Sequence, residues 1–163
     1  MRSRTLLLVT LLGLAVAAAA LDKPAQSATG FDTLKSLAGT WSATTPDGPK
    51  GDVTFKVISG GSALMQLDPE SAMVSVYHRD NQRLLMTHYC AAQNQPRMQA
   101  QVSPDGKQFR FTFFDGTNLS ASEGHMQQMT LTIDDKDHVT ENWVFLHNNG
   151  KEVTELWHLT RKP

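Results

Sequence analysis

The sequence predicts an all-β protein, an antiparallel up-and-down β-barrel of about ten strands with a short N-terminal helix capping one end. Turn sequences recur at intervals of about 8 to 12 residues, which favours short antiparallel strands. Three examples are Pro46-Asp47-Gly48, Pro104-Asp105-Gly106 and Asn149-Gly150. Apolar and polar residues alternate between the turns, without the helical patterns that βαβ units would need. A barrel or sandwich follows.

The N-terminus predicts a secretory signal peptide over residues 1–20. Arg2 and Arg4 precede an apolar run over residues 6–17, and alanines follow at a possible cleavage site. This run is too short and too rich in alanine for a membrane span. We therefore expect a flexible leader over residues 21–30, a single lipocalin-like barrel domain over residues 31–163, and a secreted or periplasmic location.

The charge and the cysteine content limit the kinds of partner and of cysteine chemistry that we expect. The chain has 15 Lys and Arg against 16 Asp and Glu, and loss of the first 20 residues would leave a net charge of about −3. No basic block is present to attract nucleic acid or anionic lipid. Cys90 is the only cysteine, so no intramolecular disulfide can form. It is either buried and inert or exposed and reactive.

The elements follow in order along the chain. Phe31, Leu34 and Leu37 recur at helical spacing between Asp32 and Gly39, which predicts one short amphipathic helix. The strands are predicted over residues 40–45, 51–58, 62–67, 72–78, 83–90, 96–102, 107–114, 125–133, 138–147 and 151–160.

Alternation along the strands predicts which side chains point inward. Four inward sets are apolar: Val53, Phe55 and Val57; Met98, Ala100 and Val102; Phe109, Phe111 and Phe113; and Met129, Leu131 and Ile133. For residues 83–90 and 138–147 both faces carry apolar residues, so the inward face stays open. The repeated Glu-x-Trp at 141–143 and 155–157 places each Glu opposite the other strand's Trp.

Strand direction alternates in such a barrel, so the connections fall at two ends. The helix marks one end, and the longer loops at 46–50, 68–70, 91–95, 115–124 and 147–151 fall at the other, which we expect to be the open mouth.

Gly39-Thr40-Trp41 opens the first strand, and Arg161 stands at the end of the last one. This placement resembles the calycin superfamily, which includes lipocalins and fatty-acid-binding proteins. The resemblance implies that Trp41 plugs the closed end and that Arg161 stacks on it. The segments His88-Tyr89-Cys90 and Asn94 to Met98 also resemble secreted bacterial lipocalin-like proteins of unknown function. The chain departs from typical lipocalins in lacking a disulfide.

A small-molecule-binding barrel is the main hypothesis, with a mostly apolar ligand that carries a polar head. Arg97 suits a carboxylate on such a ligand. No cofactor and no metal are predicted. The candidate ligand-binding residues are His88, Tyr89, Asn94, Gln95, Arg97, His125, Trp143 and Glu155.

Alternatives remain open. Met86, His88 and Cys90 share one strand face and offer donors that suit copper, and the ten-strand count is similar to nitrobindin-type barrels, which bind haem. Buried Glu141 or Glu155 beside a histidine would suit acid–base catalysis. No nucleophile elbow, phosphate loop or zinc-helix motif is present, so a non-enzymatic binder is favoured.

Overall fold

The computed structural model describes residues 30–68 and 70–163. The predicted signal peptide and residues 21–29 of the predicted leader lie outside the described residues. Gly30 begins the short helix, which runs over residues 30–35. In the described part of the chain, no helix has the length and apolar character needed to cross a bilayer.

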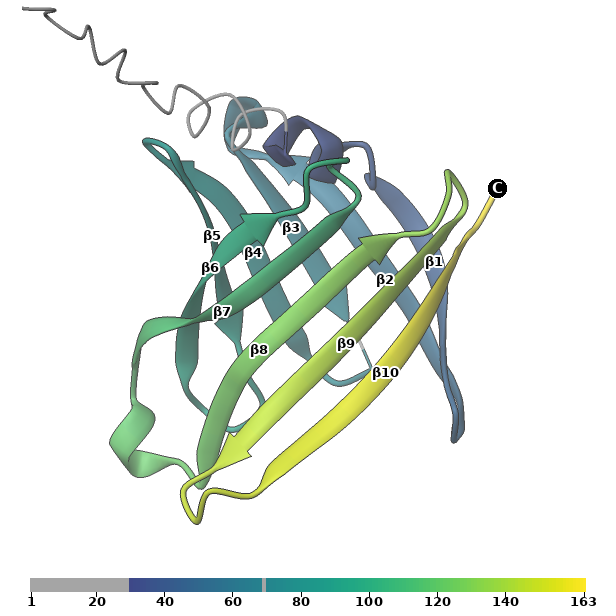
Figure 1. Ribbon diagram of the computed structural model, residues 1–163. Helices are drawn as coiled ribbons and strands as arrows, with labels where there is room; N and C mark the ends of the chain where they lie inside the picture. Colours follow the sequence, from purple (N-terminus) through teal and green to yellow (C-terminus); the bar gives the residue numbers. More distant parts are fainter. Residues whose placement is uncertain (1–29, 69) are drawn as a thin grey trace, which may run out of the picture.

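Ten antiparallel strands form a closed barrel, and the helix lies at one end of it (Figure 1). Each strand pairs with its neighbours in sequence, and β1 pairs with β10 to close the ring. The predicted fold class is confirmed. The strands are β1 (Gly39–Thr45), β2 (Gly48–Ile58), β3 (Ala63–Asp68), β4 (Met73–Asp80), β5 (Arg83–Tyr89), β6 (Gln95–Val102), β7 (Gln108–Thr117), β8 (Gly124–Ile133), β9 (His138–His147) and β10 (Glu152–Arg161). Two 3₁₀ turns, η1 (Ser59–Gly61) and η2 (Leu119–Ala121), lie in connections.

Two strands extend beyond their predicted ends because pairing outweighs local turn preference. β2 begins at Gly48 rather than residue 51, with Pro49 paired to Thr44 beside a register shift in β1. Gly51 has a φ of +90°, and a Cβ there would lie 2.5 Å from the Glu70 carboxylate, so only glycine suits this position. β7 likewise runs on to Thr117 because its last residues pair with the start of β6.

The barrel interior is the apolar core. Most of the predicted inward sets are confirmed, with Val53, Phe109, Phe111 and Leu131 fully buried. Val57 is the exception, since it is 36% exposed. The two faces left open by the sequence are now assigned, because the inward residues of β5 are Leu84, Met86 and His88, and those of β9 include Val139, Glu141 and Trp143.

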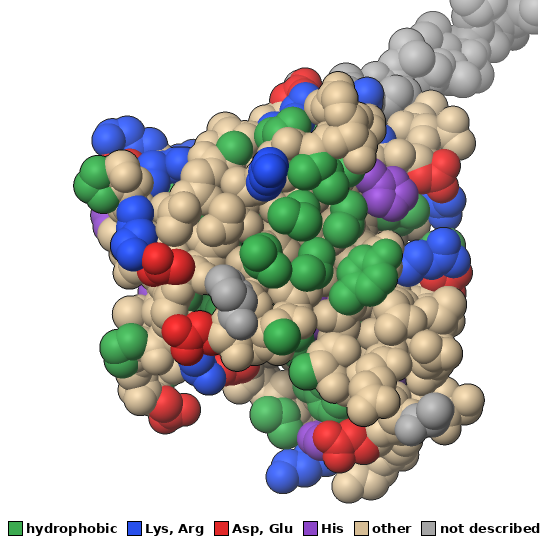
Figure 2. Space-filling view, turned by 180° about the vertical axis from the view of Figure 1, so that it is seen from behind, with side chains coloured by type: hydrophobic (Ala, Val, Ile, Leu, Met, Phe, Trp, Pro, Cys, Tyr) green, Lys and Arg blue, Asp and Glu red, His purple; other side chains and the backbone are tan. Residues whose placement is uncertain are grey.

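Part of the outer wall is also apolar. Figure 2 shows apolar side chains gathered on the face behind that of Figure 1. On β3 and β4 the half-buried outward residues Met65 and Val76 pair across the strands, as do Leu67 and Val74. The outward face of these two strands is the more apolar one, because the inward face carries Gln66, Asp68 and Ser75, so alternation does not identify the inward residues.

The helix end of the barrel is closed by a stacked pair. The Arg161 guanidinium lies 4.2 Å from the Trp41 ring centroid. It donates hydrogen bonds of 3.0 Å to the carbonyl oxygens of Ser36, Ala38 and Lys136. The Trp41 indole N–H donates to the Leu37 carbonyl at 2.8 Å. These contacts join the helix, β1 and β10.

Candidate functional site

The turn between β1 and β2 lies at the end of the barrel away from the helix (Figure 1). β1 pairs with β10 only from His158 to Arg161, so residues 152–157 of β10 extend past the hairpin. A cleft of about 270 Å³ lies there, which we call the mouth cleft. It is lined by Pro49, Lys50, Asp68, Glu70, Ser71, Met73, Glu155 and Trp157.

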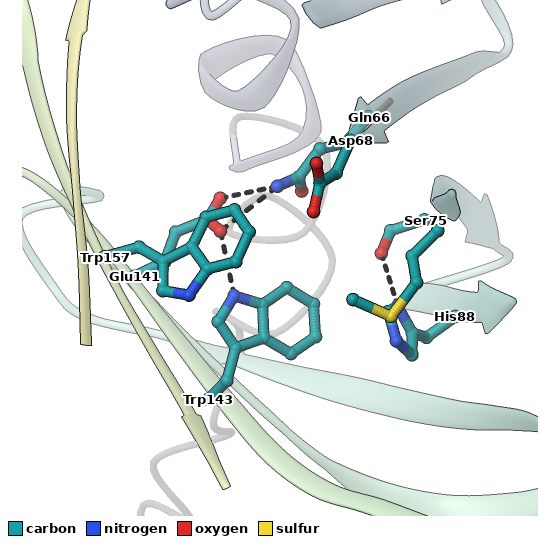
Figure 3. A pocket seen from close by; sticks show the side chains of 8 residues that line it. Gln66, Asp68, Ser75, His88, Glu141, Trp143 and Trp157 are labelled. Carbon is teal, nitrogen blue, oxygen red and sulfur yellow. Dashed lines mark hydrogen bonds between the residues drawn. The ribbon is translucent and has the colours of Figure 1, made fainter. Parts of the chain in front are cut away.

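A smaller inner cavity of about 20 Å³ lies beside the mouth cleft. Asp68, Met73 and Trp157 line both spaces, so the two are neighbours. The remaining walls of the inner cavity are Gln66, Ser75, His88, Glu141 and Trp143. Figure 3 shows Glu141, Trp143 and Trp157 on one side, Ser75 with His88 on the other, and Gln66 with Asp68 between them. The inner cavity is large enough for one water molecule or one small polar group.

Glu141 is the fully buried carboxylate of this site. The Gln66 amide donates to its two oxygens at 3.0 and 3.1 Å, and the Trp143 indole donates at 2.9 Å. Burial raises the pKa of Glu141 from 4.5 to about 7, although these hydrogen bonds oppose the rise. The group therefore changes charge near neutral pH.

A second set of hydrogen bonds links Gln66 to the opposite wall. The Tyr77 hydroxyl donates to the Gln66 carbonyl oxygen. Burial and the neighbouring Glu141 carboxylate raise the pKa of the Tyr77 phenol, and the nearby Ser75 side chain lowers it less. The Ser75 Oγ lies 2.9 Å from Nδ1 of His88. Polar side chains thus connect Glu141 with His88.

Two buried nitrogens of the site have no protein partner: Nε2 of His88 and Nε1 of Trp157. His88 is 3% exposed and Trp157 is 6% exposed. Burial lowers the pKa of His88 from 6.5 to about 4, so the ring is neutral at pH 7. Its centroid lies 5.0 Å from that of Trp143.

Three of the eight candidate residues lie at this site. His88 and Trp143 line the inner cavity, and Glu155 lines the mouth cleft. Glu155 forms an ion pair of 2.8 Å with Lys50 across the opening. The predicted Glu-x-Trp register is also confirmed, because Glu155 pairs with Trp143 and Glu141 pairs with Trp157.

Tyr89 and Arg97 lie outside both spaces. Tyr89 follows His88 on the strand and is 50% exposed. Arg97 forms a bidentate ion pair with Asp115 on the barrel surface, and its guanidinium lies 5.7 Å from the ring of Phe114. The structure therefore gives the Arg97 charge a partner on the outer wall.

Asn94 and Gln95 join connections at the mouth end. Asn94 is fully buried and donates at 2.7 Å to the Ser122 hydroxyl and to the Gly124 carbonyl. The Gln95 side-chain oxygen accepts a hydrogen bond of 2.6 Å from the Thr117 hydroxyl. Asn94 thereby fastens the connection between β5 and β6 to the start of β8.

His125 lies near a bulge in β8. The register shift between Met126 and Gln128 places Met126 opposite Phe145 and His125 opposite Leu146. The His125 ring is 4.3 Å from the Phe113 ring and 3.0 Å from the Gln127 amide oxygen. It does not line the inner cavity or the mouth cleft.

Metal donors do not converge in the described residues, where no group of three or more His, Cys, Asp or Glu is placed to hold an ion. Cys90 is half-buried, and burial raises the pKa of its thiol. Because metal ligation requires the thiolate, this environment disfavours copper binding by Met86, His88 and Cys90.

Several site residues were missing from the ligand-binding candidates, although Glu141 was named for acid–base catalysis: Gln66, Asp68, Met73, Ser75, Tyr77, Glu141 and Trp157. Glu141 and Trp157 stand on faces that alternation identified as inward candidates, so the Glu-x-Trp pair was a usable sign. The residues of β3 and β4 had no such sign, because the outward residues of these strands are more apolar than the inward Gln66, Asp68 and Ser75.

Comparison with known proteins supports the fold. No protein-family model matches the chain, and no match was found among curated proteins. The fold is similar to the crystal structure of Rv2717c from M. tuberculosis, with a TM-score of 0.53 and 15% identity over 82% of this chain and 98% of that chain. A redesigned β-barrel aligns with a TM-score of 0.32 and 17% identity over 78% of this chain and 93% of its own. At such identity the likeness to Rv2717c concerns the barrel alone.

Proposed function

We propose that this protein is a calycin-like barrel that binds a small molecule outside the cytoplasm, with the molecule's polar head in the inner cavity and its apolar body in the mouth cleft. One observation carries the proposal: His88 Nε2 and Trp157 Nε1 are buried, unpaired and lie in the walls of the same cavity. Native proteins pair more than about 90% of buried polar groups. Two unpaired nitrogens in one cavity therefore suit a bound polar group.

Size and surroundings agree with this role. The inner cavity of about 20 Å³ accepts a head of one or two heavy atoms. The mouth cleft of about 270 Å³ is close to the lower limit for ligand sites, about 300 Å³. Because Met73 and Trp157 line both spaces, the body would contact an apolar surface as it leaves the cavity.

Native mass spectrometry of the freshly purified protein tests the proposal. We expect a bound organic mass that is lost on denaturation. Trp157→Phe keeps an aromatic ring but removes the N–H donor, and we expect occupancy to correspond to about tenfold weaker binding. His158→Gln is the matched control, because His158 is the next residue on β10 and is exposed.

Two results would count against binding. One is equal occupancy in Trp157→Phe and wild type. The other is a wild-type protein that carries no organic mass and whose unfolding midpoint no compound in a fragment panel raises. Because a bound ligand stabilises the native state by RT ln(1 + L/Kd), where L is its free concentration, such a panel detects weak binders when each compound is present well above its Kd.

A second candidate is an acid–base enzyme. The observation in its favour is Glu141, whose pKa of about 7 suits a group that both takes up and releases protons near neutral pH. The mass experiment separates the two functions. An enzyme converts the recovered molecule on incubation and Glu141→Gln does not, whereas a binding protein returns it unchanged.

A further inference from the structure

The ionisable side chains around the inner cavity and the mouth cleft are mostly acidic. Asp68 and Glu141 line the cavity, and Glu70 and Glu155 line the cleft. Lys50 is the one lysine or arginine in these linings, and it is already paired with Glu155 at 2.8 Å; His88 is neutral at pH 7. An anionic ligand would meet repulsion on this path, whereas a cationic ligand would be attracted.

The neighbours of His88 indicate which of its two ring nitrogens carries the proton. Tyr77 donates to Gln66, whose amide nitrogen donates to Glu141. The Ser75 Oγ lies 2.9 Å from Nδ1 of His88, and we assign the imidazole proton to Nδ1, so that Ser75 is the acceptor. In a neutral imidazole the other nitrogen then carries a lone pair. His88 Nε2 is an acceptor, and it lines the inner cavity without a partner.

Aromatic surfaces complete the surroundings. The indoles of Trp143 and Trp157 line the cavity, and tryptophan has the strongest attraction for cations among the aromatic residues. Trp157 also lines the mouth cleft, where its unpaired N–H is a donor. A fitting ligand therefore has a cationic donor group and, next to it, an oxygen that accepts from Trp157.

We propose that the site binds an amino alcohol with an apolar body, whose ammonium group lies in the inner cavity and whose hydroxyl oxygen accepts from Trp157. This inference rests on the proposed binding function and names its ligand class. An ammonium group has three N–H donors. The acceptors around it are His88 Nε2 and the carboxylates of Glu141 and Asp68.

Isothermal titration calorimetry with four related probes tests the ligand class. Phenylethanolamine has the ammonium and the hydroxyl. Phenylethylene glycol replaces the ammonium by a neutral hydroxyl, mandelate replaces it by a carboxylate, and phenethylamine lacks the benzylic hydroxyl. We expect phenylethanolamine to bind most tightly, the glycol at least about tenfold more weakly, and mandelate not measurably. Phenethylamine should bind wild type about tenfold more weakly than phenylethanolamine does, and this difference in affinity should be much smaller in Trp157→Phe.

Affinity for phenylethanolamine should also rise with pH as Glu141 ionises, around its pKa of about 7. The groups that face Glu141 are Asp68, Tyr77 and His88 from β3, β4 and β5. Glu141→Gln should remove this rise. Glu152→Gln is the control, because Glu152 is an exposed carboxylate on β10 and its loss should leave the rise intact.

The outcomes separate the two proposals. If the glycol or mandelate binds as tightly as phenylethanolamine, the cationic ligand class is wrong while a small molecule still binds in the cleft. If none of the four probes binds, the ligand class is again wrong, and the binding function is decided by the retained mass of the native protein. A pH rise that persists in Glu141→Gln would also overturn the assignment of the ammonium position.

Discussion

At the scale of single residues, Glu141 and His88 oppose each other in their effect on stability. Glu141 has its pKa raised from 4.5 to about 7, so its ionisation destabilises the fold as pH rises through this range. His88 has its pKa lowered from 6.5 to about 4, so its protonation destabilises the fold as pH falls through that range. Each pKa shift changes the free energy of unfolding by about 3 kcal/mol. Between pH 4.5 and 6.5 the two groups change this free energy with pH in opposite directions, and the changes nearly cancel.

Glu141→Gln should remove the part of the pH dependence of stability that Glu141 contributes. Below pH 4.5 the carboxyl is neutral in the folded and unfolded states, and above about pH 7 it is ionised in both. We expect the free energy of unfolding of the variant, relative to wild type, to rise by about 3 kcal/mol across this range. Urea unfolding at several pH values measures it.

Glu152→Gln provides the reference for that experiment, because an exposed carboxylate should give a difference from wild type that hardly changes with pH. His88→Gln should show the opposite trend to Glu141→Gln and gain stability relative to wild type as pH falls from 6.5 to 4. A constant difference between Glu141→Gln and wild type would contradict the raised pKa of Glu141.

At the scale of elements, Arg161 connects the helix to both strands that close the barrel. It bonds the carbonyls of Ser36 and Ala38 at the helix C-terminus, where carbonyl groups lack helical partners. It also stacks on Trp41 at the start of β1. One side chain thus fixes the relative position of three elements.

We expect Arg161→Ala to lower the free energy of unfolding by about 2–3 kcal/mol, through loss of three hydrogen bonds and the stacking contact. Arg161→Lys should restore less than half, because a lysine ammonium lacks the planar fork that reaches several carbonyls. Urea unfolding followed by tryptophan fluorescence measures both.

The neighbouring residue gives the control for Arg161. Lys162 pairs with Asp52 at 2.6 Å, but both side chains are about half exposed. Lys162→Ala should therefore cost less than about 1 kcal/mol. Equal losses of unfolding free energy in Arg161→Ala and Lys162→Ala would show that the contacts of Arg161 with Trp41 and the three carbonyls add little to the stability of the barrel.

At the scale of the whole molecule, the barrel is closed over only part of its height. The described register pairs β1 with β10 from His158 to Arg161 and not over residues 152–157. In hydrogen exchange, the amides of residues 152–157 that face away from β9 should exchange at least about a hundredfold faster than the β1-facing amides of residues 158–161. Equal protection along β10 would mean that the opening closes in solution.

Much of the fold was predictable because turn chemistry is local. Sequences such as Pro104-Asp105-Gly106 interrupt strands by their own conformational preferences, and all ten strands were found between such turns. The site was only partly predictable. His88 and Trp143 were identified, but Gln66 and Ser75 lie on strands whose outward face is the more apolar one, so their direction depends on tertiary pairing.

The hydrogen bonds of Asn94 have a consequence for the rate of ligand entry. Asn94 donates to Ser122 and Gly124, so the β5–β6 connection is tied to β8 at the end of the barrel away from the helix. Entry into the inner cavity then depends on side chains such as Met73, which borders both spaces and reorients in nanoseconds or less if it is exposed to solvent. A ligand would associate without waiting for a slow loop movement. Residence time, rather than the rate of capture, would then distinguish one ligand from another.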